Sequence, residues 1–190
     1  MSDNKKVAVL VSGGGTNLQA LIDKEKAGQL PGIEIVKVIA SRADAFALER
    51  AAKAGIATAV APEQEQVLEE LQASEADLVV LAGYMRVLSP DIIQEYRNRI
   101  INIHPSLIPK YCGKGFYGKR VHKAVIEGGE KESGATVHYV DEGVDTGEII
   151  LQRKVPVMPD DTPDTLAARV LETEHEILAE GLIKAAAKIS

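Results

Sequence analysis

Short, mostly apolar runs alternate with amphipathic segments through the first half of this chain. The runs cover residues 7–11, 33–40, 58–60, 77–82 and 100–104. Strands that are apolar along nearly their whole length are typical of parallel sheets, which helices cover on both faces. Each intervening segment is long enough for one helix, and such connections favour parallel neighbours. The pattern therefore predicts an α/β fold with a doubly wound, mostly parallel sheet.

The pattern changes after about residue 118. Residues 135–140 and 148–152 alternate polar and apolar side chains, and a turn-rich segment, 141–147, separates them. Alternation with a period of two is typical of strands with one solvated face, so we expect an antiparallel pair at one edge of the sheet. An amphipathic segment, 162–188, predicts a long C-terminal helix. We expect a single domain over residues 1–190.

Composition narrows the functional classes. The chain has 22 Lys and Arg against 28 Asp and Glu, a net charge of −6, which argues against a nucleic-acid partner. Its one cysteine, Cys112, excludes an internal disulfide, and its four histidines lack metal-ligand spacing. No apolar run approaches the roughly 20 residues of a membrane helix, and no signal peptide is apparent. We expect a cytoplasmic monomer or homodimer with small-molecule substrates, no membrane partner and no metal.

The segment 100–109 carries the most informative polar residues. It reads Ile-Ile-Asn-Ile-His-Pro-Ser-Leu-Ile-Pro, a strand that ends at His104 because Pro105 lacks the N–H that a central strand needs. Side chains alternate along a strand, so Asn102 and His104 share one face. Ligands of open α/β sheets bind beyond the carboxyl ends of the strands. The pair is a candidate oxyanion stabiliser and acid–base group, although a capping histidine beside a loop asparagine would give the same pattern.

A glycine-rich segment, Ser-Gly-Gly-Gly-Thr-Asn at 12–17, joins the first strand to the first helix. Glycines allow a close backbone approach, and the N–H groups at the start of a helix attract anions. A dinucleotide site would have glycine where Leu18 stands, and a P-loop would need Gly-Lys-Ser or Gly-Lys-Thr. The segment therefore indicates a site for one phosphate, with a tight turn as the structural alternative.

An acid–base histidine usually needs a carboxylate that fixes its tautomer or raises its pKa. Asp145, between Gly143 and Gly147, is the favoured candidate, and Asp141 and Glu142 on the same segment are rivals. A turn aspartate that bonds to its own backbone is the structural alternative for Asp145.

Two features in the second half of the sequence can be interpreted either as functional or as purely structural. The glycine-rich segment 111–118 is either a loop that folds over a site or a connector. His138, in an alternating strand, is expected to be packed or hydrogen-bonded rather than to bind a metal.

Four segments together resemble the phosphoribosylglycinamide formyltransferase family. They are Ser-Gly-Gly-Gly-Thr-Asn at 12–17, Leu-Ala-Gly-Tyr-Met-Arg at 81–86, Asn-Ile-His-Pro-Ser-Leu-Ile-Pro at 102–109 and Val-Asp-Glu-Gly-Val-Asp-Thr-Gly-Glu-Ile-Ile at 140–150. The resemblance runs nearly end to end and implies a Rossmann-like amino-terminal half. It also implies transfer of a formyl group from 10-formyltetrahydrofolate, the cosubstrate, to the amine of glycinamide ribonucleotide in purine synthesis.

The resemblance implies a role for each matching residue. Asn102 would polarise the formyl oxygen, and His104 would act as general acid. Asp145 would keep His104 charged and help to move the proton of the amine. The phosphate and ribose of the substrate would bind Gly14, Gly15, Thr16, Asn17 and Glu174. The folate would bind Met85, Arg86, Val87, Leu88, Asn102, Val140, Asp141, Glu142, Gly143 and Val144.

Two departures from the family pattern affect these expectations. Residues 61–66 are acidic and lack the arginine that commonly contacts the folate, which bears on folate affinity but not on the chemistry. Cys112 stands where a proline is common. Lys114, Lys119 and Arg120 are candidates to supply the missing positive charge.

Three other functions remain open. A formyltetrahydrofolate deformylase would share the three polar residues and add an amino-terminal regulatory domain. Formylation of an aminoacyl-tRNA would need an additional basic domain, and we expect neither extra domain in 190 residues. A non-catalytic nucleotide-binding protein would keep the glycine segment but would not need Asn102, His104 and Asp145 together.

Overall fold

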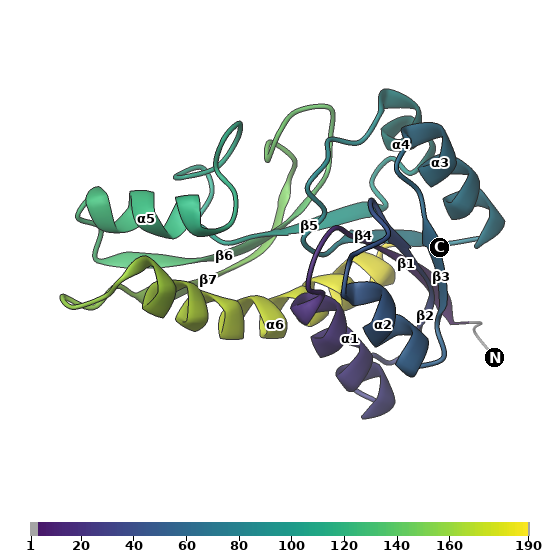
Figure 1. Ribbon diagram of the computed structural model, residues 1–190, viewed down its shortest axis with the longest axis horizontal. Coiled ribbons are helices and arrows are strands. Elements are labelled where there is room, and N and C mark those ends of the chain that lie inside the picture. The colour runs from purple at the N-terminus through teal and green to yellow at the C-terminus, as the bar shows by residue number, and fades with distance from the viewer. Residues whose placement is uncertain (1–3, 190) are drawn as a thin grey trace.

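The computed structural model describes residues 4–189, and within this range the chain forms one seven-stranded sheet (Figure 1). The strands are β1 Lys5–Val11, β2 Ile33–Ala40, β3 Ala57–Val60, β4 Leu78–Leu81, β5 Ile100–His104, β6 Glu132–Tyr139 and β7 Ile149–Pro156. Their order in the sheet is β3-β2-β1-β4-β5-β6-β7. Neighbours from β3 to β5 are parallel, whereas β6 is antiparallel to both β5 and β7. The predicted mostly parallel sheet with an antiparallel edge is confirmed.

Helices cover both faces of the sheet. The helices α1 Thr16–Lys26, α2 Ala47–Lys53, α5 Lys119–Glu127 and α6 Pro163–Ala187 contribute to the hydrophobic core on one face. The helices α3 Gln64–Ala73 and α4 Pro90–Glu95 contribute to a second core on the other face. Figure 1 shows α1, α2 and α6 on one side of the strands and α3 and α4 on the other. No helix within residues 4–189 is long and apolar enough to span a membrane.

The side-chain alternation on β5 positions the polar pair. Ile101 and Ile103 are buried in the core beneath α1 and α6, and Ile100 is buried in the core beneath α3 and α4. Asn102 and His104 therefore face the α3 and α4 side at the carboxyl end of the strand, as the alternation predicts. The carboxyl ends of the parallel strands β1 and β4 lie at the same end of the sheet as the carboxyl end of β5.

The long C-terminal helix is confirmed with nearly the expected bounds. Its start is capped by Thr162, whose side chain accepts a hydrogen bond from the Thr165 N–H at 3.2 Å, and Pro163 occupies the first helical position. Gly181 lets α6 lie directly on β6, because a Cβ at this position would lie 2.6 Å from Cγ1 of Val137. This close packing fixes the helix that carries Glu174 against the antiparallel strands β6 and β7.

The antiparallel edge is longer than the sequence predicts. β6 begins at Glu132 rather than at residue 135, and β7 continues to Pro156 rather than ending at residue 152. Ser133 is buried here, so the polar and apolar alternation no longer marks the strand. The added length is supported by a cross-strand ion pair between Lys154 and Glu132 at 2.9 Å.

Candidate active site

A cavity of about 630 Å³ opens at the carboxyl edge of the parallel strands. Its walls come from the segment after β4, the end of β5, the segment before α5, the segment after β6, and α6. In Figure 1 the segments after β6 and before α5 rise on the same side of the sheet. Asn102, His104 and Asp145, which are far apart in the sequence, all line this cavity.

His104 lies at the base of the cavity and is 5% exposed. Its Nε2–H donates a hydrogen bond of 2.9 Å to the carbonyl oxygen of Tyr111, which leaves Nδ1 free of the proton in the neutral ring. Nδ1 lies 3.6 Å from Oδ2 of Asp145. Burial lowers the pKa of His104 and outweighs the Tyr111 carbonyl and the Asp145 charge, which both raise it. This direction differs from the expectation that Asp145 keeps His104 charged, because desolvation is the larger effect in the free protein.

Asp145 reaches the histidine because the segment after β6 folds back tightly. At Gly147 a Cβ would lie 1.8 Å from the Tyr139 carbonyl oxygen, so a larger residue could not take this path. Asp141 stabilises the turn from within, since its Oδ1 accepts hydrogen bonds from the Gly143 N–H at 3.0 Å and the Thr146 hydroxyl at 2.6 Å. The backbone of Asp145 is left-handed, with φ of 57°. Of the three acidic residues on the segment, Asp145 is therefore the one directed at the histidine.

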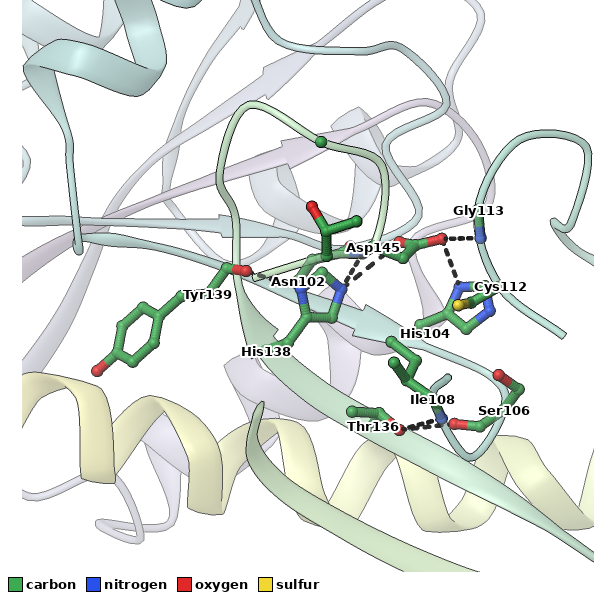
Figure 2. Close-up of polar contacts among 12 residues, drawn as sticks. Asn102, His104, Ser106, Ile108, Cys112, Gly113, Thr136, His138, Tyr139 and Asp145 are labelled. Carbon is green, nitrogen blue, oxygen red and sulfur yellow. Dashed lines mark hydrogen bonds and ion pairs between the residues drawn. The ribbon is translucent and has the colours of Figure 1, made fainter. Parts of the chain in front are cut away.

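The Asp145 carboxylate lies between two imidazole rings (Figure 2). Oδ2 accepts a hydrogen bond of 2.9 Å from the Gly113 N–H, and Oδ1 lies 3.5 Å from Nε2 of His138. Burial alone would raise the pKa of Asp145. The His138 contact, the Gly113 N–H and the charges of both imidazoles together outweigh burial and lower the pKa below its ordinary value. Asp145 is thus held as a carboxylate.

His138 determines how Asn102 is oriented. The two residues face each other across the antiparallel β5–β6 pair. Nδ1–H of His138 donates to the Tyr139 carbonyl oxygen at 2.8 Å, so in the neutral ring Nε2 accepts a hydrogen bond of 3.2 Å from Nδ2 of Asn102. The second hydrogen on Nδ2 remains available for an oxygen in the cavity. The sequence predicts that His138 is hydrogen-bonded, which is confirmed, but its place beside Asn102 and Asp145 was not predicted.

The turn after β5 is held by Thr136, which is fully buried on β6. Its hydroxyl donates to the Ser106 carbonyl oxygen at 2.7 Å and accepts from the Ile108 N–H at 3.3 Å (Figure 2). The Ser106 hydroxyl donates to the Lys110 carbonyl oxygen at 2.6 Å. These bonds fix the path toward Tyr111, whose carbonyl binds His104.

The glycine-rich segment is held by hydrogen bonds from the segment after β4 and from helix α2. The Ser12 hydroxyl accepts a hydrogen bond of 2.9 Å from the Met85 N–H, and Nε of Arg50 donates to the Gly14 carbonyl oxygen at 2.7 Å. Gly15 has φ of 74°, and a Cβ there would lie 2.5 Å from Cβ of Ala47. Of this segment, Asn17 lines the large cavity, whereas Gly14, Gly15 and Thr16 do not.

Glu174 is the buried acid at the α6 side of the cavity. It is 8% exposed, and its Oε1 accepts a hydrogen bond of 3.3 Å from Nδ2 of Asn17. Burial raises the pKa of Glu174 to about 7, and the hydrogen bond from Asn17 opposes this increase only in part. The structure therefore brings Glu174 beside the residue at the start of α1, as a shared binding site requires.

Most of the residues assigned to the folate by resemblance line the cavity. Those that line it are Met85, Arg86, Val87, Leu88, Asn102, Val140, Asp141, Gly143 and Val144. Met85, Val87 and Val144 are large apolar side chains that are 44–69% exposed, as is typical of an open ligand site. Glu142 does not line the cavity, and its carboxylate pairs instead with Arg97.

The acidic segment 61–66 does not line the cavity in the described part of the chain. Arg86 lies against it, with its guanidinium donating a hydrogen bond to the Pro62 carbonyl oxygen. Lys114 and Lys119 line the cavity, and Lys119 pairs with Asp164 at 2.7 Å. Arg120 stacks on the Tyr117 ring at 4.8 Å.

Residues 4–189 contain no group of three or more His, Cys, Asp and Glu side chains arranged to hold a metal ion. The polar groups that the structure brings together in the cavity are the imidazole of His104, the carboxylate of Asp145 and the amide of Asn102. Two histidines complete the site in ways that the sequence did not reveal. His138 could have been found from the pairing of β6 with β5, and His122 of α5 lines the cavity without a sequence signal.

Comparison with known proteins gives consistent matches. The Formyl transferase family model matches residues 5–182. Phosphoribosylglycinamide formyltransferase from Haemophilus influenzae is 44% identical, over 91% of this chain and 83% of its own length. The crystal structure of glycinamide ribonucleotide transformylase 1 from Symbiobacterium toebii is 41% identical with a TM-score of 0.90, covering 97% of this chain and 88% of that one.

A trifunctional purine biosynthetic protein from Drosophila melanogaster is 46% identical over 90% of this chain. The chain spans only 13% of the length of that relative.

Proposed function

The chain belongs to the formyl transferase family, and from this premise we propose that it transfers the formyl group of 10-formyltetrahydrofolate to the amine of 5′-phosphoribosylglycinamide. The observation that carries the proposal is the meeting of Asn102, His104 and Asp145 in one cavity that also reaches Asn17 and Glu174. An amide donor, an acid–base group and a carboxylate suit acyl transfer through a tetrahedral intermediate. A second binding region at α1 and α6 suits a phosphorylated ribose.

The cavity has room and chemistry for both substrates. The apolar wall at Met85, Val87 and Val144 suits the flat pterin and benzoyl groups of a folate, and Arg86 offers a cation for its carboxylates. Lys114, on the segment before α5, provides a second cation in the lining of the cavity. These two residues offer positive charge where the segment 61–66 has none.

The mechanism follows from the protonation states in the free site. The amine attacks the formyl carbon, and Nδ2–H of Asn102 donates to the oxygen that becomes negative. Neutral His104 accepts the proton of the amine at Nδ1, because its Nε2–H is bound to the Tyr111 carbonyl. The imidazolium that forms is stabilised by Asp145 at 3.6 Å. His104 then returns the proton to the folate nitrogen as the carbon–nitrogen bond breaks.

The test is a spectroscopic assay with 10-formyltetrahydrofolate and glycinamide ribonucleotide. We expect turnover that requires both compounds and falls at least about 100-fold in His104→Gln, the lower range for acid–base catalysis. His175→Gln is the matched control, since His175 does not line the cavity and should leave turnover unchanged. Loss of formyl groups without acceptor would instead indicate a deformylase, and binding without turnover a non-catalytic protein. Either result would overturn the proposal.

We also expect a cytoplasmic monomer or homodimer that acts on small molecules without a nucleic-acid or membrane partner. Gel filtration with light scattering would give the oligomeric state, and a larger assembly would contradict this expectation.

A further inference from the structure

His122 is a buried histidine in the cavity wall that the proposed mechanism does not use. It lies on α5, is 4% exposed and lines the same cavity as His104. Its Nδ1 is buried without a hydrogen-bond partner among the residues described. An unpaired polar atom in a buried position costs about 1–3 kcal/mol, and a ligand that contacts this wall of the cavity could supply the missing partner.

The position of His122 relative to the two binding regions identifies that partner. The wall on this side is built by α5 and α6 and includes Lys119, Leu171 and Glu174, whereas the apolar folate wall is formed by other segments. His122 is also close enough to His104 for their charges to interact. A molecule that extends from Glu174 to His104 within this cavity can therefore contact the wall that carries His122.

The imidazole of His122 is suited to accept a hydrogen bond rather than to carry a charge. Burial lowers its pKa, and a positive charge on His104 lowers it further. A neutral ring always has one nitrogen that accepts. In glycinamide ribonucleotide, the group between the ribose and the reactive amine is an amide with one N–H.

We propose that His122 binds the acceptor substrate, by accepting a hydrogen bond from the amide N–H of the glycinamide arm. This inference rests on the proposed function and adds a recognition residue to it. The bond holds the glycinamide arm of the bound substrate in the part of the cavity next to His104. It also favours acceptors that carry an N–H at this position over analogues with an ester or ether oxygen there, because an oxygen would face the imidazole lone pair.

The test compares His122→Phe, which keeps a ring of similar size but removes both nitrogens, with the wild-type protein. We expect KM for glycinamide ribonucleotide to rise about tenfold, as for the loss of one buried hydrogen bond, with KM for the folate unchanged and kcat within about threefold. His175→Phe is the matched control, since Nε2 of His175 is also buried without a partner but lies outside the cavity. An unchanged KM for the ribonucleotide, or an equal rise in both KM values, would overturn the inference.

A second measurement uses the wild-type protein and does not depend on folding of the variant. Ring nitrogen resonances of His122 should shift when glycinamide ribonucleotide is added alone and should not shift with a folate analogue alone. Absence of a shift at saturating ribonucleotide would overturn the inference. A wild-type protein that binds the ribonucleotide with this shift but does not transfer the formyl group would refute the proposed function and leave the His122 contact standing.

Discussion

The buried carboxyl of Glu174 makes stability depend on pH in the direction opposite to that of an acid whose pKa is lowered on folding. Its pKa is raised from 4.5 to about 7 because burial penalises the carboxylate. Between these values the folded chain holds a proton that the unfolded chain has lost. Stability therefore falls as pH rises from 4.5 through about 7, and the loss is complete above that range.

The magnitude follows from the distance between the two pKa values. It corresponds to about 3 kcal/mol once Glu174 is fully ionised, of which about 1 kcal/mol is already lost at about pH 5. Glu174→Gln removes the ionisation and keeps an oxygen that can accept from Asn17. The stability of this variant relative to wild type should therefore grow by about 2 kcal/mol between about pH 5 and about pH 8. For a chain of this size the melting-temperature difference should widen by about 4–8 °C.

The assay is thermal unfolding followed by circular dichroism at several pH values. Comparing the variant with wild type at each pH cancels the effect of every other titrating group. Glu172→Gln is the control, because Glu172 is exposed two residues earlier on the same helix, and its difference from wild type should stay within about 0.5 kcal/mol. A difference for Glu174→Gln that does not change with pH would show that Glu174 ionises as it does in water and would refute the reasoning.

The remaining predictions concern the glycine segment and the catalytic cluster. Gly15→Ala should destabilise the protein by about 2–4 kcal/mol, because Gly15 has a positive φ and a Cβ there would collide with Ala47. Gly14 has open space around its Cα, so Gly14→Ala should melt at nearly the wild-type temperature. It should instead raise KM for the ribonucleotide. Asp145→Asn should keep the fold, since asparagine tolerates the left-handed backbone, and lower kcat at least about 100-fold. It should also shift the acid limb of the pH–rate profile downward, because removing the carboxylate lowers the pKa of His104 further. His104→Ala should reduce kcat by a similar factor and abolish that limb, and a folded variant with normal kcat would remove both role assignments.

The alternation of side chains was enough to predict the core of the site. On β5 it placed Asn102 and His104 on one face of the strand. The order of the apolar runs predicted that the carboxyl end of β5 lies at the same end of the sheet as the carboxyl end of β1, where the glycine segment begins. Both inferences need only local periodicity and the rule that short crossovers join parallel strands. Neither needs knowledge of distant contacts.

The rest of the site depends on contacts that local patterns do not encode. His138 joins the cluster only because the register of β6 sets it opposite Asn102, and a shift of one residue would turn it to the other face. The choice among three acidic residues likewise depends on tertiary pairing. Asp141 is used within its own turn, Glu142 pairs with Arg97, and Asp145 is left for the histidines.

The segment before α5 contacts His104 and Asp145 through its backbone. The Tyr111 carbonyl holds Nε2 of His104, and the Gly113 N–H holds Asp145, so residues on either side of Cys112 clamp the two partners in place. Burial, and then the charge of Asp145, raises the pKa of the Cys112 thiol, which disfavours the thiolate form. Because these two contacts use only main-chain atoms of Tyr111 and Gly113, they do not involve the side chain at position 112. Movement of this segment, by contrast, would release both the imidazole and the carboxylate at once.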